Sequence, residues 1–495
     1  MNIKQAKEEI KHTVQAYLAK DEAGEYRIPA IRQRPILLMG PPGIGKTQIM
    51  EQIARECRIG LVAYTITHHT RQSAVGLPFI REEEFGGKSC SVTEYTMSEI
   101  IASVYRKMRD TGLSEGILFI DEINCVSETL APTMLQFLQC KTFGNQAVPE
   151  GWLIVAAGNP PEYNKSVREF DMVTLDRVRY LNIEADFKVW KEYAKKQRIH
   201  SAILSYLKLR PKNFYRVEAD VDGLSFVTAR GWEDLSNLMD VYGELGLSVD
   251  ETVIGEFLHH ADVAEDAAAY FDLYRKYQDD YGIPEILAGR VRPEVFARLG
   301  QAEFDERLSV VHLLLDGLGA YFEAAGREKQ KTDEWYTFLK EYRGRLEDED
   351  DPAACYSDLL SEWEQIFLQE KQGGFYTREE ARKKAELLAG IKNGIPKEGA
   401  DKKESFAQAK LGFDLQKERL EAAEASASNV LECAFDFMEQ AFSDGEEMVV
   451  FVTELTLGAQ SALFLAEHEC ERYLHYNEQL LIGKRKRELL SELSR

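Results

Sequence analysis

The sequence lacks several features that mark common classes of protein. Its seven cysteines are scattered and form no Cys-x-x-Cys pair, so they predict neither a disulfide framework nor a thiolate zinc site. No apolar stretch approaches the roughly 18 to 20 residues that a membrane-spanning helix needs. The first residues, MNIKQAKEEIKH, alternate in charge, unlike a signal peptide or a membrane anchor. We therefore expect a cytoplasmic protein with no membrane partner.

Positive charge is also scarce. The chain carries 61 Lys and Arg against 84 Asp and Glu, a formal net charge of -23. Non-specific binding to phosphate backbones depends on clustered Lys and Arg. The short basic run at 484–487 lies beside acidic residues, and we interpret it as a solvated helix face. The composition therefore disfavours nucleic acid as a partner.

A phosphate-binding pattern is present near the N-terminus. Residues 40–47 read GPPGIGKT between the apolar run Ile36-Leu37-Leu38-Met39 and a helical pattern. Glycines at these positions let the backbone wrap an anion, with N–H groups and a helix N-terminus aimed at the phosphates of ATP. Lys46 would reach the β- and γ-phosphates, and Thr47 would offer its hydroxyl to Mg²⁺. The predicted nucleotide-binding residues are Gly40, Pro41, Pro42, Gly43, Ile44, Gly45, Lys46 and Thr47.

Polar side chains also follow two later apolar runs. Ile117 to Ile120 is followed by Asp121-Glu122, and the run from Trp152 to Gly158 is followed by Asn159. The carboxyl ends of parallel strands meet at the ligand crevice of an open α/β sheet. Asp121 is therefore predicted to hold the magnesium shell together with Thr47, and Glu122 to orient or deprotonate the attacking water.

These motifs, with Asp176-Arg177 before a strand-like run and Thr228-Ala229-Arg230 opening a later helix, resemble an AAA+ ATPase of the MoxR-like branch, which is related to the magnesium-chelatase ATPase subunit. The resemblance implies that Asn159 is sensor 1, which positions the lytic water. It implies that Arg177 is the arginine finger acting on a neighbour's nucleotide, with Arg168 and Arg179 as nearby alternatives. It also implies that Arg230 is sensor 2, a contact to the γ-phosphate.

The expected fold class is α/β. Strands and helices alternate over residues 1–184, which predicts a parallel P-loop sheet with helices on both faces. In the family picture, 185–289 form a helical lid, and 290–495 are a mainly helical region of unknown role. The stretch 397–417 is highly charged and predicts either a long solvated helix or a linker.

Two hairpins interrupt the alternation. Residues 76–80 and 91–95 predict short strands around an acidic run and Gly86-Gly87. In the MoxR-like clade this is the helix-2 insert, and Phe85-Gly86-Gly87 is either a substrate-contacting tip or an ordinary turn. A second hairpin around Gly144-Asn145 matches the pre-sensor 1 hairpin of the same clade.

Three functions are compatible with these motifs. The favoured one is Mg²⁺-dependent ATP hydrolysis at the interfaces of a ring, expected to be a hexamer, which remodels a protein client or matures its metal cofactor. The resemblance also implies a partner with a von Willebrand factor A domain. A nucleic-acid motor or loader is disfavoured by the acidic charge. A nucleotide-gated scaffold with little turnover is disfavoured because Lys46, Asp121, Glu122 and Asn159 are all present.

Overall fold

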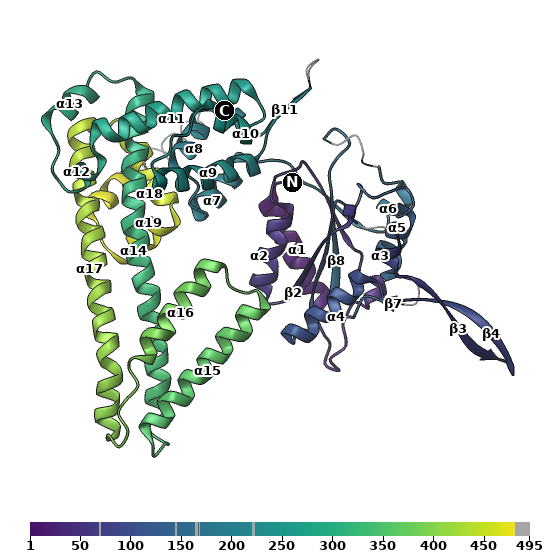
Figure 1. The fold of residues 1–495 in the computed structure, drawn as a ribbon. Helices are drawn as coiled ribbons and strands as arrows, with labels where there is room; N and C mark the ends of the chain where they lie inside the picture. The colour runs from purple at the N-terminus through teal and green to yellow at the C-terminus, as the bar shows by residue number, and fades with distance from the viewer. Residues whose placement is uncertain (69–70, 144–145, 164–166, 168, 220–222, 481–495) are drawn as a thin grey trace, which may run out of the picture. The chain divides into compact units, whose positions relative to one another are not determined.

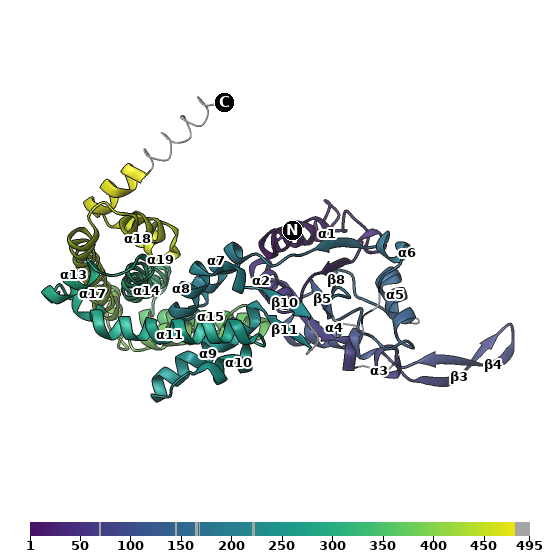
Figure 2. The same ribbon diagram turned by 90° about the horizontal axis from the view of Figure 1, so that it is seen from above.

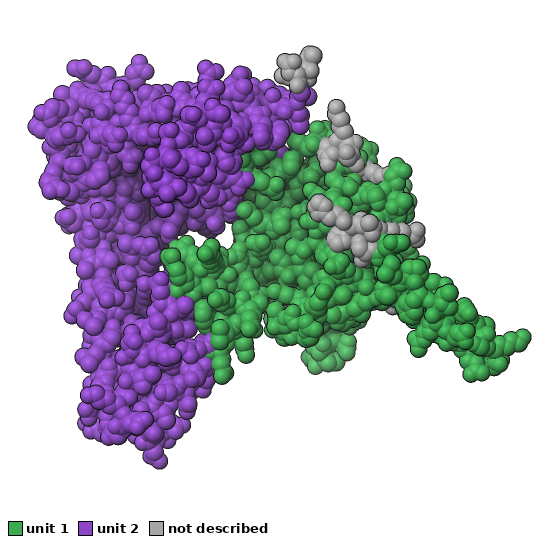
Figure 3. Space-filling model, viewed as in Figure 1, with its two compact units in different colours: residues 1–190, 228–231, 365–382 green, residues 191–227, 232–364, 383–495 purple. Residues whose placement is uncertain are grey.

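The computed structural model describes residues 1–68, 71–143, 146–163, 167, 169–219 and 223–480 (Figure 1). Three sequence features therefore lie outside the described residues: Gly144-Asn145, Arg168 and the basic run at 484–487. The chain forms two compact units (Figure 3). Unit 1 comprises residues 1–190, 228–231 and 365–382, and unit 2 comprises 191–227, 232–364 and 383–495.

Unit 1 is built around a five-stranded parallel sheet. Its strands are β1 (Ile36–Met39), β2 (Gly60–Thr65), β5 (Gly116–Asp121), β8 (Trp152–Gly158) and β9 (Arg179–Asn182). Their order in the sheet is β2-β5-β8-β1-β9, and every pairing is parallel. The connection after β1 runs to β2 on one side of β1, and the chain later passes from β8 to β9 on its other side. Such a reversal opens a crevice at the carboxyl ends of the strands, where α/β proteins bind ligands.

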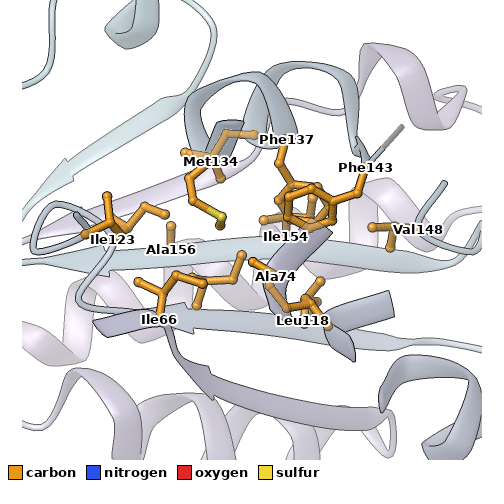
Figure 4. Packing of buried hydrophobic residues seen from close by; sticks show 14 of the residues in the cluster. Ile66, Ala74, Leu118, Ile123, Met134, Phe137, Phe143, Val148, Ile154 and Ala156 are labelled. Carbon is orange, nitrogen blue, oxygen red and sulfur yellow. The ribbon is translucent and has the colours of Figure 1, made fainter. Parts of the chain in front are cut away.

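Both faces of this sheet are covered, which explains why its strands are almost uninterrupted runs of apolar residues. One face packs against α4 (Glu99–Thr111) and α5 (Ala131–Cys140). Figure 4 shows part of that core, with Leu118 and Ile154 of the sheet beside Met134 and Phe137 of α5. Side chains alternate along a strand, so the intervening residues Ile117 and Phe119, both fully buried, point to the face that α2 (Lys46–Cys57) covers.

Local sequence explains where several helices begin. The first helix, α1 (Ile3–Leu18), starts with a capping box in which Asn2 Oδ1 accepts from the Gln5 N–H at 3.0 Å and the Asn2 N–H donates back to Gln5 Oε1 at 3.1 Å. The Asp401 side chain likewise caps α17 (Lys402–Phe442), because its Oδ1 accepts from the Glu404 N–H at 2.8 Å. These bonds satisfy backbone donors that a helix start otherwise leaves unpaired.

The remaining elements are mostly helical. In chain order they are η1 (Ala30–Arg32), η2 (Ile66–His68), α3 (Arg71–Val75), β6 (Thr142–Phe143), β7 (Gln146–Ala147), α6 (Met172–Leu175), α7 (Phe187–Lys196), α8 (Ser201–Leu209), η3 (Pro211–Asn213), β10 (Arg216–Ala219), β11 (Leu224–Val227), α9 (Ala229–Leu245), α10 (Glu251–Phe257), α11 (Ala261–Tyr281), α12 (Ile283–Leu287), α13 (Pro293–Leu299), α14 (Phe304–Arg345), α15 (Pro352–Gly373), α16 (Arg378–Lys392), α18 (Glu446–Leu457) and α19 (Ala459–Glu467).

The predicted insert between α3 and α4 is a hairpin of two antiparallel strands, β3 (Pro78–Phe85) and β4 (Lys88–Tyr95). Figures 1 and 2 show it extending from the rest of unit 1. The acidic run, expected to lie between two short strands, belongs to β3 itself. The turn is Gly86-Gly87, where both residues have positive φ angles of 60° and 78° that glycine adopts without steric cost.

Unit 2 is dominated by the two longest helices, α14 and α17, which pack antiparallel. Gln416 of α17 donates to Glu328 of α14 at 2.7 Å, and the rings of Phe406 and Tyr342 stack farther along the pair. The charged stretch predicted as either a helix or a linker is therefore a helix from Lys402 onward. It is not solvated on every side, because Ala409 and Gln416 are buried.

One helix over the described residues, α14, is long and apolar enough by itself to cross a membrane, with an 18-residue window of mean hydropathy 1.2. The bent pair α18 and α19 passes the same test only when taken together. This differs from the expectation from the sequence, in which no apolar stretch approached the length of a membrane-spanning helix. Half of the α14 window is buried inside the protein, and its buried residues include the polar side chains Ser309 and His312. Packing within unit 2 accounts for the apolar character of α14.

The boundaries of the two units differ from the expected boundaries at 184 and 289. The expected lid helices α8 and α11 pack against α14, so the lid and most of the C-terminal region form one core. The region expected to form a helical lid also contains the antiparallel pair β10 and β11.

A charged cluster joins distant segments of unit 2. The Glu454 carboxylate on α18 lies 2.7 Å from Lys191 Nζ and 2.6 Å from Lys195 Nζ, with Lys208 Nζ at 3.6 Å. Burial opposes ionisation of Glu454, but the lysines outweigh it and lower the pKa of its carboxyl. Next to this cluster, His312 on α14 is buried and contacts Ser205 on α8, with Nδ1 2.9 Å from Oγ.

We predict that His312 makes unit 2 sensitive to acid. Burial, reinforced by Lys208, Lys191 and Lys195 and opposed by Glu454, lowers the pKa of His312 from 6.5 to about 3. In the unfolded chain, His312 therefore binds a proton below pH 6.5. In the folded chain, it binds that proton only near pH 3. Stability should fall by about 1.4 kcal/mol per pH unit within that window.

His312→Asn keeps a polar atom for Ser205 but cannot titrate. Urea unfolding between pH 7 and pH 4 is expected to show a shallower loss of stability in this variant. An unchanged slope would contradict the assignment to His312.

Candidate nucleotide-binding site

The P-loop connects β1 to the N-terminus of α2. Gly43 and Gly45 have φ angles of 71° and 93°, in the left-handed region that favours glycine. Gly40 is constrained by space, because a Cβ there would lie 2.6 Å from the carbonyl oxygen of Ile183, the residue after β9. Any side chain at these positions would open the loop, so the glycines are needed for its curvature.

Lys46 lies at the centre of the site and is buried. Its Nζ donates to the Gly40 and Pro41 carbonyl oxygens, each at 2.8 Å, and to Asn159 Oδ1 at 2.9 Å. Burial lowers the pKa of Lys46 to about 8, with Asp121 opposing the shift and Arg230 adding to it. A buried ammonium of this kind gains strongly from an anionic ligand, since charges interact more strongly away from bulk water.

Thr47 and Asp121 form the part of the site suited to a cation. Thr47 Oγ1 donates to Asp121 Oδ2 at 2.9 Å. Mg²⁺ binds oxygen ligands at 2.0–2.1 Å in an octahedron, which places neighbouring ligands about 2.9 Å apart. The two oxygens therefore fit adjacent positions in a magnesium shell. Over the described residues, no group of three or more His, Cys, Asp or Glu side chains is arranged to hold a metal ion, so the remaining ligands of such a shell would be water and phosphate.

Glu122 follows Asp121 in an unusual backbone conformation. Its φ angle is 58°, in the left-handed region that non-glycine residues seldom adopt. Its carboxylate accepts from Thr67 Oγ1 at 2.9 Å, and Thr67 lies just past the end of β2. The backbone turn thus directs the Glu122 side chain toward the end of a neighbouring strand, at the same edge of the sheet as Asp121.

The structure places the three candidate arginines differently. The Arg230 N–H donates to the Gly43 carbonyl at 3.1 Å, so Arg230 lies beside the P-loop. Arg177 is exposed and donates from Nη1 to Gln139 of α5. Arg179 is paired within the chain, with Nη1 2.6 Å from Thr13 Oγ1 and Nη2 in an ion pair with Glu9 of α1.

Two residues of this site, Thr67 and Asn124, were not predicted from the sequence. Thr67 lies two residues past the end of β2, so the rule that flagged polar residues after apolar runs could have found it. Asn124, in the turn after β5, is 2% exposed and bonds to the backbone of Asn159. Nothing in its sequence context distinguishes it from an ordinary turn asparagine.

Fold and site together define a P-loop nucleotide-binding protein, with a glycine-rich loop, a buried lysine and a hydroxyl–carboxylate pair at the switch point of a parallel sheet. A family comparison is more specific. Residues 36–174 match the family described as ATPase family associated with various cellular activities (AAA). These residues form an AAA ATPase domain, which indicates nucleotide binding and ATP hydrolysis. No curated protein matches the chain.

Proposed function

We propose that this protein is a Mg²⁺-dependent ATPase of the MoxR-like type, which assembles into a hexameric ring and uses ATP hydrolysis to remodel a protein client. The observation that carries the proposal is the convergence of Lys46, Thr47, Asp121, Glu122 and Asn159 at one edge of the sheet. The ends of two strands, β5 and β8, and the P-loop contribute to this cluster, so a chance match to a short motif does not explain it.

Each side chain has a chemical task in this proposal. Lys46 neutralises the β- and γ-phosphates, and its buried position strengthens that interaction. Thr47 and Asp121 hold Mg²⁺, which when bound neutralises phosphate charge. Glu122 accepts a proton from the attacking water, and the Asn159 amide orients that water. Arg230 beside Gly43 contacts the γ-phosphate as sensor 2.

The ring requires a residue that acts across a subunit interface. Arg177 suits this role better than Arg179, since Arg177 is exposed and Arg179 is held by Glu9 and Thr13 of its own chain. An exposed guanidinium can reach a neighbour's nucleotide, whereas Arg179 would first lose an ion pair.

The β3–β4 hairpin supports the MoxR-like assignment and a role in client contact. It lies between α3 and α4, where the clade carries its helix-2 insert. Apolar side chains are exposed on it, among them Ile80 at 76% and Phe85 at 57% exposure. We propose that its tip touches the client, that a partner with a von Willebrand factor A domain delivers the client, and that this occurs in the cytoplasm. Maturation of a client's metal cofactor belongs to the same proposal.

Mixing two inactive variants tests the shared site. Glu122→Gln and Arg177→Ala are each expected to lose ATPase activity. In an equimolar ring, about one interface in four would join an intact Glu122 to an intact Arg177 of the adjacent subunit. Steady-state ATPase measurements should therefore show activity in the mixture that neither variant has alone.

In the matched control, Glu122→Gln is mixed with the double variant Glu122→Gln/Arg177→Ala. No subunit then has an intact Glu122, so this mixture must stay inactive. If the first mixture is also inactive although subunits exchange, the shared site is excluded. A protein that remains monomeric with ATP and Mg²⁺ in light scattering would exclude the ring.

A further inference from the structure

Asn124 lies between the two parts of the site that act on water in the proposed function. It is in the turn after β5, two residues beyond Glu122, and its side chain bonds to the segment that carries Asn159. Asn124 Nδ2 donates to the Asn159 carbonyl oxygen at 2.7 Å, and Asn124 Oδ1 accepts from the Asn159 N–H at 3.3 Å. One amide therefore satisfies both backbone groups of one residue.

The contact is enclosed. Asn124 is 2% exposed, and a Cβ on Gly158 would lie 2.5 Å from Asn124 Oδ1. The close approach of the amide thus depends on a glycine directly before Asn159. In this enclosed position an amide–backbone pair has no water to replace a lost partner, so each bond is costly to remove.

The turn that carries Asn124 is also tied to the strand before Asn159. The Ile123 N–H donates to the Ala157 carbonyl at 2.9 Å, and the Cys125 N–H donates back to the Glu122 carbonyl at 2.8 Å. Glu122 itself is held at a φ angle of 58°, a conformation that persists only where surrounding contacts enforce it. Contacts made by the two residues directly after Glu122 therefore fix its turn against the segment 157–159.

At this position the Asn159 carbonyl needs a hydrogen-bond donor and the Asn159 N–H needs an acceptor. Only an amide side chain supplies both. Asparagine offers a donor and an acceptor in one plane. An ionised aspartate accepts only, so it would turn a lone pair toward the Asn159 carbonyl and leave that group unpaired. A leucine of similar size would leave both backbone groups unpaired.

We propose that Asn124 is a positioning residue for hydrolysis, which sets the distance between the Glu122 carboxylate and the Asn159 amide. The inference rests on the proposed roles of Glu122 and Asn159. Asn159 in turn bonds to Lys46 through its side chain, so Asn124 holds the backbone of a residue whose amide faces the phosphate-binding lysine. A shift of about 1 Å in such a group is enough to slow a reaction about 100-fold.

The test compares Asn124→Asp, which keeps the shape and removes the donor, with the wild-type chain. The expected result is a 10- to 100-fold lower kcat with an ATP Kd within threefold of wild type by isothermal titration, because Lys46 and the P-loop are untouched. Asn124→Ala serves as the second variant, should the aspartate prevent folding. Thermal unfolding establishes that each variant is folded.

Gln33→Glu is the matched control for loss of a buried amide. Gln33 is 4% exposed and donates from Nε2 to the Tyr17 and Ile28 carbonyl oxygens, in the same unit but away from the P-loop contacts. This variant should lower the unfolding temperature and leave kcat unchanged.

A double-mutant cycle separates positioning from general destabilisation. If Asn124 acts through Asn159, Asn124→Asp should slow Asn159→Ala no further. Multiplying effects, or a wild-type kcat in folded Asn124→Asp, would overturn the inference while leaving the proposed function intact. A wild-type kcat in Asn159→Ala would instead refute the proposed role of Asn159 and this inference with it.

Discussion

Lys46→Ala is expected to weaken ATP binding about 10³-fold, because an ammonium about 4 Å from a phosphate charge contributes about 4 kcal/mol in a partly buried site. Glu122→Gln is expected to bind ATP normally and to lower kcat by about 10² to 10⁴, the contribution typical of a general base. Titration calorimetry and steady-state ATPase rates on both variants distinguish the two effects.

Lys141→Ala is the control for the loss of a buried lysine. Burial lowers the pKa of Lys141 to about 8, as it does for Lys46, but Lys141 Nζ donates to the Ala30 carbonyl oxygen at 2.6 Å and not to the P-loop. Its removal should leave ATP affinity unchanged. An undiminished affinity in Lys46→Ala would contradict the nucleotide site itself.

A chain that ends at residue 290 is expected to lose the fold of unit 2. In the structure, α8 and α11 bury apolar side chains against α14, and each exposed Leu or Ile costs about 1.5 to 3 kcal/mol. A few such losses exceed the 5 to 15 kcal/mol by which a typical domain is stable. The truncation also removes Glu370, which forms an ion pair with Arg58 of unit 1 at 3.0 Å.

Circular dichroism and thermal unfolding measure this effect. A chain ending at Leu480 is the control, since it retains every described helix of unit 2. A soluble truncation at 290 with a sharp unfolding transition and full ATPase activity would show that the lid is independent of the C-terminal helices.

The parts of the fold that the sequence predicted are those encoded by local patterns. The run from Trp152 to Gly158 is buried throughout and forms β8 with the expected bounds. The AAA domain and the α/β class follow from such runs and from the P-loop. The finer MoxR-like assignment stays a prediction, as do the roles of Asn159, Arg177 and Arg230.

Features that depend on distant contacts were not predictable in this way. Trp335 packs against Gly390 and Gly412, and no local pattern reveals that these three residues meet. The division into two units results from many such contacts, so it could not be derived from composition. Asn124 was missed for the same reason: it becomes significant only through a partner that lies 35 residues away.

Unit 1 is built from three separate segments of the chain, which has a consequence for its biosynthesis. Its three segments end at residues 190, 231 and 382. A ribosome adding 5 to 20 residues per second needs about 10 to 40 s to pass from the first of these ends to the last. During that interval the sheet and P-loop have been synthesised, but the segment that supplies Glu370 has not. The nascent chain therefore exposes part of unit 1 while α14 and α15 are still being made, a period in which a ribosome-associated chaperone would have access to it.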